Sequence, residues 1–170
     1  MQHHSQNRKN MKNPIASSFE KLLVLLVKSE IRFTTVGGIA VCLNGYVRLT
    51  EDVDILVDGE ESNIEKMLAA LSGFGEGYAS ELSVDDFPDE EGAVRIIEAV
   101  ENCQIDIFVR MKGLKLRDFS DDIEYFQAED GTSIPFIGSK SLISLKSNTV
   151  REKDKVDVSV LRRLDEQEDD

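Results

Sequence analysis

The chain has 170 residues, of which 41% are hydrophobic and 31% charged, and its formal charge is −13. This length suits one domain with one substantial core, and the charge excludes a generally basic surface that would hold a long nucleic acid by counterion release. No apolar run reaches the roughly 20 residues of a membrane span, and the first residues lack the apolar segment of a signal peptide. The sequence therefore predicts a cytoplasmic protein without a membrane partner and without extensive duplex nucleic-acid binding.

The two ends of the chain are predicted to lie outside the folded domain. Residues 1–13 are polar and have no hydrophobic period, which predicts disorder. Residues 14–165 are expected to form a single domain, and the acidic residues 166–170 a solvated tail. Cys42 and Cys103 lie far apart among apolar residues, and their spacing fits neither a disulfide framework nor a zinc site. Both are predicted to be buried thiols.

The first half of the chain alternates helical and extended patterns. Ser17 and Glu20 form a capping-box pattern, which predicts the start of a helix with an apolar face. Further on, two glycines separate a strand-like run from a short apolar helix. The predicted elements are a helix over 17–30, a strand over 32–36, a helix over 39–43, a strand over 46–57 and a helix over 60–72.

The second half is predicted to be mainly extended before it becomes helical. Residues 85–92 are acidic and are expected to form a solvated loop. Two β-rich runs follow, joined by a connection short enough for a hairpin. Pro135 lies in a later strand and predicts an edge position or a bulge, while Val156, Val160, Leu161 and Leu164 are the expected inner stripe of the last helix. The predicted elements are strands over 93–100, 103–109, 123–126 and 133–137, and helices over 139–147 and 149–164.

Three aspartates in strand-like runs are the candidate metal ligands. Asp52 and Asp54 are two positions apart in a predicted strand, so both side chains project from the same face and can clamp a divalent metal. Asp106 lies within an apolar run, where a charge needs a compensating cation or hydrogen bonds. On a neighbouring strand it would close the site, and Mg²⁺ suits such a set because it prefers oxygen ligands. This constellation makes phosphoryl or nucleotidyl transfer the first hypothesis.

The glycine pair and two nearby polar residues are the candidate phosphate ligands. Gly37 and Gly38 precede a predicted helix, where backbone N–H groups can approach a phosphate. Arg48 and Thr50 share the strand face of Asp52 by parity, and Arg48 is expected either to contact a phosphate or to hold an acid in place. Each of these features also has an ordinary structural interpretation when it is taken alone. Asp154 and Asp157, further along, are expected to pair with Arg151, Lys153 or Lys155 of their own helix.

Residues 36–57 resemble the core motif of the nucleotidyltransferase superfamily related to polymerase beta. The likeness is greatest to the small bacterial proteins grouped with the AbiEii-type toxin nucleotidyltransferases. It continues at Asp106, as the third acid, and over residues 141–157, and it spans roughly residues 33–164 with 85–92 unmatched. The resemblance implies an α+β fold in which a mixed sheet is flanked by helices, here expected on one side.

The resemblance also implies an activity and the residues that carry it. The implied reaction moves a nucleoside monophosphate from an NTP to a hydroxyl of RNA, protein or a small molecule and releases pyrophosphate. Asp106 would help to deprotonate the acceptor hydroxyl, and Lys146 would meet the triphosphate as a point charge, although an ordinary surface lysine is as compatible with its position. The implied metal ligands for two Mg²⁺ ions are Asp52, Asp54 and Asp106, and the implied nucleotide-binding residues are Gly37, Gly38, Arg48, Thr50 and Lys146.

Two departures from better-known relatives leave other functions open. Many superfamily members have Gly-Ser where this chain has Gly37-Gly38, so the serine hydroxyl is missing. We expect no separate helical domain after Leu164, so selection of the acceptor is expected from this domain or from a partner. A cognate antitoxin protein is a further expected partner. The alternatives are a nucleotide-binding or partner-binding protein that keeps the fold without turnover, and an interaction module whose acids are surface features.

Overall fold

The computed structural model describes residues 15–168, so the predicted disorder of residues 1–13 and the last two residues of the predicted tail lie outside the described part. The strands are β1 Phe33–Val36, β2 Asp52–Val57, β3 Ala93–Glu98, β4 Cys103–Phe108, β5 Ile123–Gln127 and β6 Ser133–Ile137. The α-helices are α2 Ser17–Lys28, α3 Gly37–Leu43, α4 Glu61–Leu71, α5 Ser139–Lys146 and α6 Glu152–Glu168. Three 3₁₀ helices are η1 Tyr78–Glu81, η2 Val84–Asp86 and η3 Leu116–Asp122.

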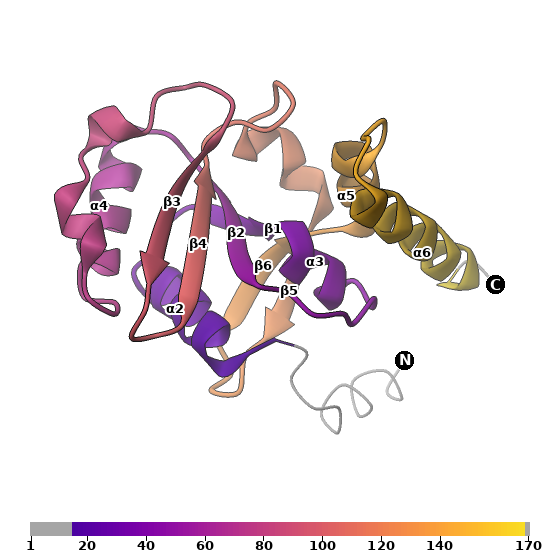
Figure 1. Cartoon of the computed structure of the whole chain (residues 1–170), viewed down its shortest axis with the longest axis horizontal. Helices are drawn as coiled ribbons and strands as arrows, with labels where there is room; N and C mark the ends of the chain where they lie inside the picture. Colours follow the sequence, from indigo (N-terminus) through magenta and orange to yellow (C-terminus); the bar gives the residue numbers. More distant parts are fainter. Residues whose placement is uncertain (1–14, 169–170) are drawn as a thin grey trace.

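The six strands form one mixed sheet in the order β3-β4-β2-β1-β6-β5 (Figure 1). The central strand β2 runs antiparallel to β1 and parallel to β4. At one edge, β3 and β4 form the antiparallel hairpin that the sequence predicts, and at the other edge β5 and β6 form a second antiparallel pair. The α+β class with a mixed sheet is therefore confirmed.

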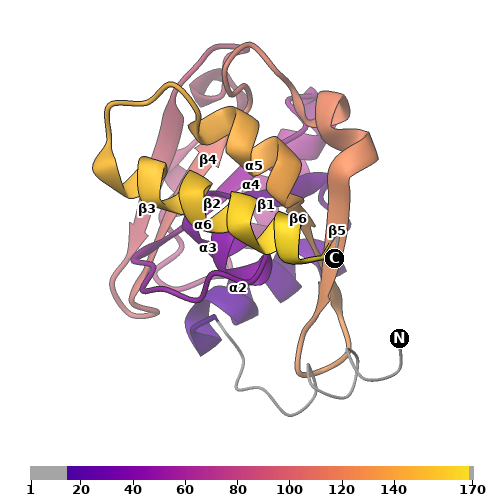
Figure 2. The same ribbon diagram turned by 90° about the vertical axis from the view of Figure 1, so that its right-hand side faces the viewer.

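Helices pack on both faces of the sheet, which corrects the expectation of helices on one side. Because side chains alternate along a strand, Ile55 of β2 enters a hydrophobic cluster with α2 and α4, and its neighbour Leu56 enters a second cluster on the other face. In that second cluster Leu142 of α5 and Leu161 of α6 are buried. In Figure 2, α5 and α6 lie in front of the strands. Each apolar helix face must be buried against another layer, which here requires both sides of the sheet.

Strand β2 begins at Asp52, whereas the sequence predicted a strand from residue 46. A strand needs partners for its backbone groups. Strand β1 ends at Val36, which pairs with Asp54, and the register with β4 brings Gln104 beside Asp52. The segment before Asp52 has no strand to pair with, and it forms an irregular loop.

Pro135 lies in β6, between β1 and β5, so the predicted edge position is wrong. Proline removes one donor from a ladder. The β1–β6 ladder has a single register pair, Thr35 with Phe136, which is consistent with a strand whose donors are interrupted.

Two helices differ from the predicted pattern at their ends or faces. The capping box at Ser17 is not formed, because α2 begins after Ala16 without a side-chain cap. Helix α6 continues through Glu168, into the predicted tail, and Val156 of its predicted inner stripe is 47% exposed. The neighbouring Asp157 is instead fully buried, and the ion pairs described below compensate its charge.

The two cysteines are buried and unpaired, as predicted. Burial raises the pKa of the Cys103 thiol to about 12. Within residues 15–168, no helix has both the length and the apolar character needed to span a membrane.

Candidate metal centre

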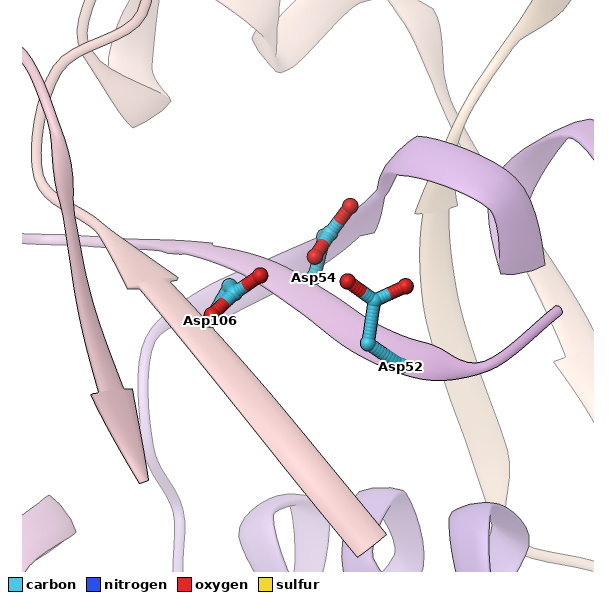
Figure 3. A group of neighbouring side chains, drawn as sticks. All are labelled: Asp52, Asp54 and Asp106. Carbon is cyan, nitrogen blue, oxygen red and sulfur yellow. The ribbon is translucent and has the colours of Figure 1, made fainter. Parts of the chain in front are cut away.

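Three aspartates from two adjacent parallel strands converge at one point of the sheet. Asp52 and Asp54 project from the same face of β2, and the β2–β4 register places Asp106 directly beside Asp54. One carboxylate oxygen from each residue lies within 4.8 Å of the other two. Figure 3 shows the three carboxylates pointing toward one another from the two ribbons. The predicted meeting of these acids is present in the structure, and we call them the acid triad.

The acid triad carries more negative charge than its own surroundings compensate. Asp106 is 5% exposed, and Asp54 Oδ1 is buried without a hydrogen-bond partner among residues 15–168. Burial, followed by the charges of Asp52 and Asp106, raises the pKa of Asp54 to about 7. Burial and Asp106 also raise the pKa of Asp52. A buried polar atom without a partner costs free energy, and oxygen ligands of this kind are those that Mg²⁺ prefers. The triad therefore fits a divalent metal ion.

Arg95 of β3 holds the third acid, and the sequence reasoning missed it. Its Nε donates to Asp106 Oδ1 at 2.9 Å and its Nη2 to Asp106 Oδ2 at 3.3 Å. The β3–β4 register sets Arg95 directly opposite Asp106. The hairpin predicted over these two runs, once given its register, would have identified this pair. On the other side of the triad, Gln104 Nε2 lies 3.5 Å from Asp52 Oδ2.

The glycine pair lies directly against the triad and the loop that precedes β2. Gly37 has φ +65°, and a Cβ at this position would collide with the Asp54 carboxylate. A Cβ at Gly38 would lie 2.8 Å from Thr50 Cγ2 and 3.3 Å from Arg48 Nη1. Because neither glycine has a side chain, those of Asp54, Thr50 and Arg48 can approach the start of α3.

Arg48 holds an acid, which decides between the two roles left open for it. It lies in the loop before β2 and not on a strand, so the parity argument that placed it beside Asp52 is wrong. Its Nε and Nη2 donate to the two carboxylate oxygens of Asp157, each at 2.8 Å. Asp157 is fully buried although it carries a charge, and this forked contact supplies the compensation that burial requires.

Lys146 joins the same buried network from the end of α5. Its Nζ lies 2.9 Å from Asp154 Oδ1 and 3.1 Å from Asp157 Oδ2. The expectation that Asp157 pairs with cations of its own helix is wrong, because its partners come from α5 and from the loop before β2. Asp154 does approach Arg151, at 4.0 Å. The positive charge of Lys146 partly offsets the rise in the pKa of Asp54 that burial and the other two acids cause.

A concave surface of about 610 Å³ lies between α5 and α6. It borders Lys146 and not the acid triad. Its lining residues are Lys146, Ser147, Asn148, Thr149, Lys155, Val158, Ser159, Arg162 and Arg163.

The arrangement of the sheet and helices is similar to that of a solved structure. A Thermotoga maritima protein proposed to be a nucleotidyltransferase superposes with a TM-score of 0.50 at 16% sequence identity, over 71% of this chain and 75% of that chain. At this identity the likeness concerns the fold alone, and it defines a nucleotidyltransferase-like fold. No protein-family model matches the chain, and no curated protein does either. The AbiEii-type assignment stays a prediction.

Proposed function

We propose that the protein is a Mg²⁺-dependent nucleotidyltransferase that moves a nucleoside monophosphate from an NTP to a hydroxyl acceptor. The observation that carries the proposal is the convergence of Asp52, Asp54 and Asp106 within 4.8 Å, with one buried carboxylate oxygen left without a partner. The nucleotidyltransferase-like fold supports it. Bound Mg²⁺ ions would supply charge stabilisation at the attacking and leaving oxygens.

The chain's own residues would mainly align the reactants. Asp52 and Asp54 would bind both metal ions, and Asp106 would bind the metal nearer the acceptor and help to deprotonate the acceptor hydroxyl. Gly37 and Gly38, at the start of α3, would present backbone N–H groups to the nucleotide phosphates near Thr50. Arg48 and Lys146 stand behind this position, fixed by Asp157, and would contribute positive charge near the triphosphate.

The test is label transfer from α-labelled NTPs to cellular RNA, protein or small molecules. We expect transfer with Mg²⁺, no transfer with a chelator, and at least about a 100-fold loss in a D52N/D54N variant, because the metal ligands are removed. Asp85→Asn is the matched control, since Asp85 is an exposed acid outside the site. Transfer that survives in D52N/D54N, or that is absent with every acceptor fraction, contradicts the proposal.

A second candidate function is nucleotide binding without turnover. The observation that favours it is that Asp106, the acid proposed to serve the acceptor, is already engaged by Arg95. A ligand that binds only the native protein raises its melting temperature. A rise with Mg²⁺ and NTP, combined with an unchanged nucleotide after long incubation with all acceptor fractions, would identify this function. The absence of any rise would instead support an interaction module.

We further propose that the partner, if the protein acts as a toxin, is a cognate antitoxin protein. The sequence resemblance to AbiEii-type toxins is the support for this role. Expression of the wild-type chain should then arrest growth, whereas the D52N/D54N variant should not. Growth arrest by both proteins would contradict a toxin role based on transfer.

A further inference from the structure

The contact between Arg95 and Asp106 affects how a metal ion binds to the acid triad. This inference rests on the proposed function, which places a metal ion there. Arg95 and a divalent metal ion both require the carboxylate of Asp106. We propose that Arg95 is a displaceable cation that occupies the third acid and that a divalent metal must compete with it. Arg95 is therefore a positioning residue that sets the metal concentration at which the site fills.

The geometry of the contact explains why the two cations compete. The guanidinium engages both oxygens of Asp106, at 2.9 and 3.3 Å. Such a forked contact combines charge with fixed hydrogen-bond geometry. It neutralises one of the three acids, and a metal ion that approaches Asp106 also meets the repulsion of the guanidinium. Asp106 is 5% exposed, so its charge depends on a neighbouring cation for compensation, and the guanidinium and the metal ion are alternatives for that role.

The surroundings of Arg95 allow it to leave. Its side chain is 58% exposed, whereas that of Asp106 is 8% exposed. Within the described chain β3 is an edge strand of the sheet, with β4 as its neighbour on one side. The guanidinium can therefore rotate into solvent without disturbing either hydrophobic cluster, and its charge remains at the rim of the site. The acid, held by β4 in the middle of the sheet, stays in place for the metal.

Lys153 provides a control that separates two effects of a cation. One is the occupation of the Asp106 carboxylate, and the other is the effect of positive charge alone. Lys153 is exposed at the start of α6, and its charge partly offsets the rise in the pKa of Asp52 that burial and Asp106 cause. Its charge acts on the triad, as that of Arg95 does, but Arg95 alone of the two forms a hydrogen-bonded ion pair with Asp106 in the structure. Lys153→Gln thus removes one positive charge near the acids and leaves the forked contact intact.

The experiment measures Mn²⁺ binding at constant ionic strength from the electron paramagnetic resonance signal of free Mn²⁺. The proteins are wild type, R95Q, R95K, K153Q and D52N/D54N. We expect R95Q to bind Mn²⁺ at least about fivefold more tightly than wild type, and K153Q to change the Kd by less than about twofold. We expect R95K to lie between wild type and R95Q, because lysine keeps the charge but cannot form the fork.

The outcomes separate this inference from the proposed function. Equal tightening in R95Q and K153Q, or unchanged or weaker binding in R95Q, overturns the competition by Arg95. If D52N/D54N binds Mn²⁺ as wild type does, the bound ion is not at the triad, and the metal site of the proposed function fails. Should R95Q fail to fold, R95K provides the same comparison, since an affinity equal to that of wild type would overturn the role of the fork.

Discussion

Gly37 is constrained in two ways, by its backbone conformation and by its close contact with Asp54 of the acid triad. Its φ is +65°, a region that costs other residues about 1–2 kcal/mol, and a Cβ would also collide with the Asp54 carboxylate. We predict that Gly37→Ala lowers the free energy of unfolding in urea by more than the conformational cost alone. Gly113→Ala is the matched control, because Gly113 has φ +78° and open space around it. Equal losses in the two variants would show that the contact with Asp54 is unimportant.

Asp54 should make the metal-free protein less stable as the pH rises. Its pKa is about 7 in the folded protein against 3.8 for the unperturbed group, so the folded state binds the proton more tightly. Folding stability then falls as the pH rises from about 4 to about 7, where the unfolded chain releases the proton first. The carboxyls whose pKa is lowered, such as Asp130, act in the opposite direction and below this window.

The measurement is urea unfolding of wild type and Asp54→Asn in a chelator between pH 4 and pH 8. We predict that stability declines across this range in wild type and that the decline is smaller in the variant, because asparagine does not titrate. A parallel decline in both proteins would assign the pH dependence to other groups.

At the residue scale, the sequence predicted contacts between neighbours in a sheet but not contacts between distant charges. The meeting of Asp54 with Asp106 follows from strand alternation and from two adjacent strands. The pairing of Arg48 with Asp157 joins residues 109 positions apart, one in an irregular loop and one on a helix. No periodicity relates such positions, so only the packing of α6 against the loop determines their contact.

At the scale of elements, patterns predicted the types of the helices and strands better than their ends or inner faces. The segment 46–51 alternates like a strand, yet among residues 15–168 it has no strand partner once β1 ends at Val36. On α6 the predicted inner stripe included Val156, which is 47% exposed, whereas Asp157, Val158 and Leu161 form the buried face. The charged Asp157 on this face has partners from other elements, which the local pattern could not predict.

Asp157 should be the residue that fixes α6 to the rest of the protein. It is fully buried and pairs with Arg48 at 2.8 Å and Lys146 at 3.1 Å. We predict that Asp157→Ala lowers the free energy of unfolding by about 3–5 kcal/mol, since it leaves two cations without their shared partner. Glu152→Ala on the same helix removes an exposed pair with Lys155 and should cost no more than about 0.5 kcal/mol. Similar losses in the two variants would mean that the buried network does not fix the helix.

At the scale of the whole molecule, the sheet connects two hydrophobic clusters, and its central strand contributes to both. Ile55 and Leu56 are consecutive residues of β2 and belong to opposite clusters. One cluster cannot open without exposing the back of the strands that support the other. The described chain should therefore unfold as one cooperative domain, and the single domain expected for residues 14–165 stays a prediction that this unfolding tests.

The test of this cooperativity introduces one cavity on each side of the sheet. Leu23 of α2 and Leu161 of α6 are both fully buried, and either change to Ala should cost about 2–5 kcal/mol. Hydrogen exchange across a urea series would follow α2 and α6 separately. In a single domain, each variant lowers the urea midpoint of both helices equally, because the two clusters share one transition. If Leu161→Ala shifted only α6, the face that carries α5 and α6 would be an independently unfolding unit, and the acid triad would lie beside a layer that opens by itself.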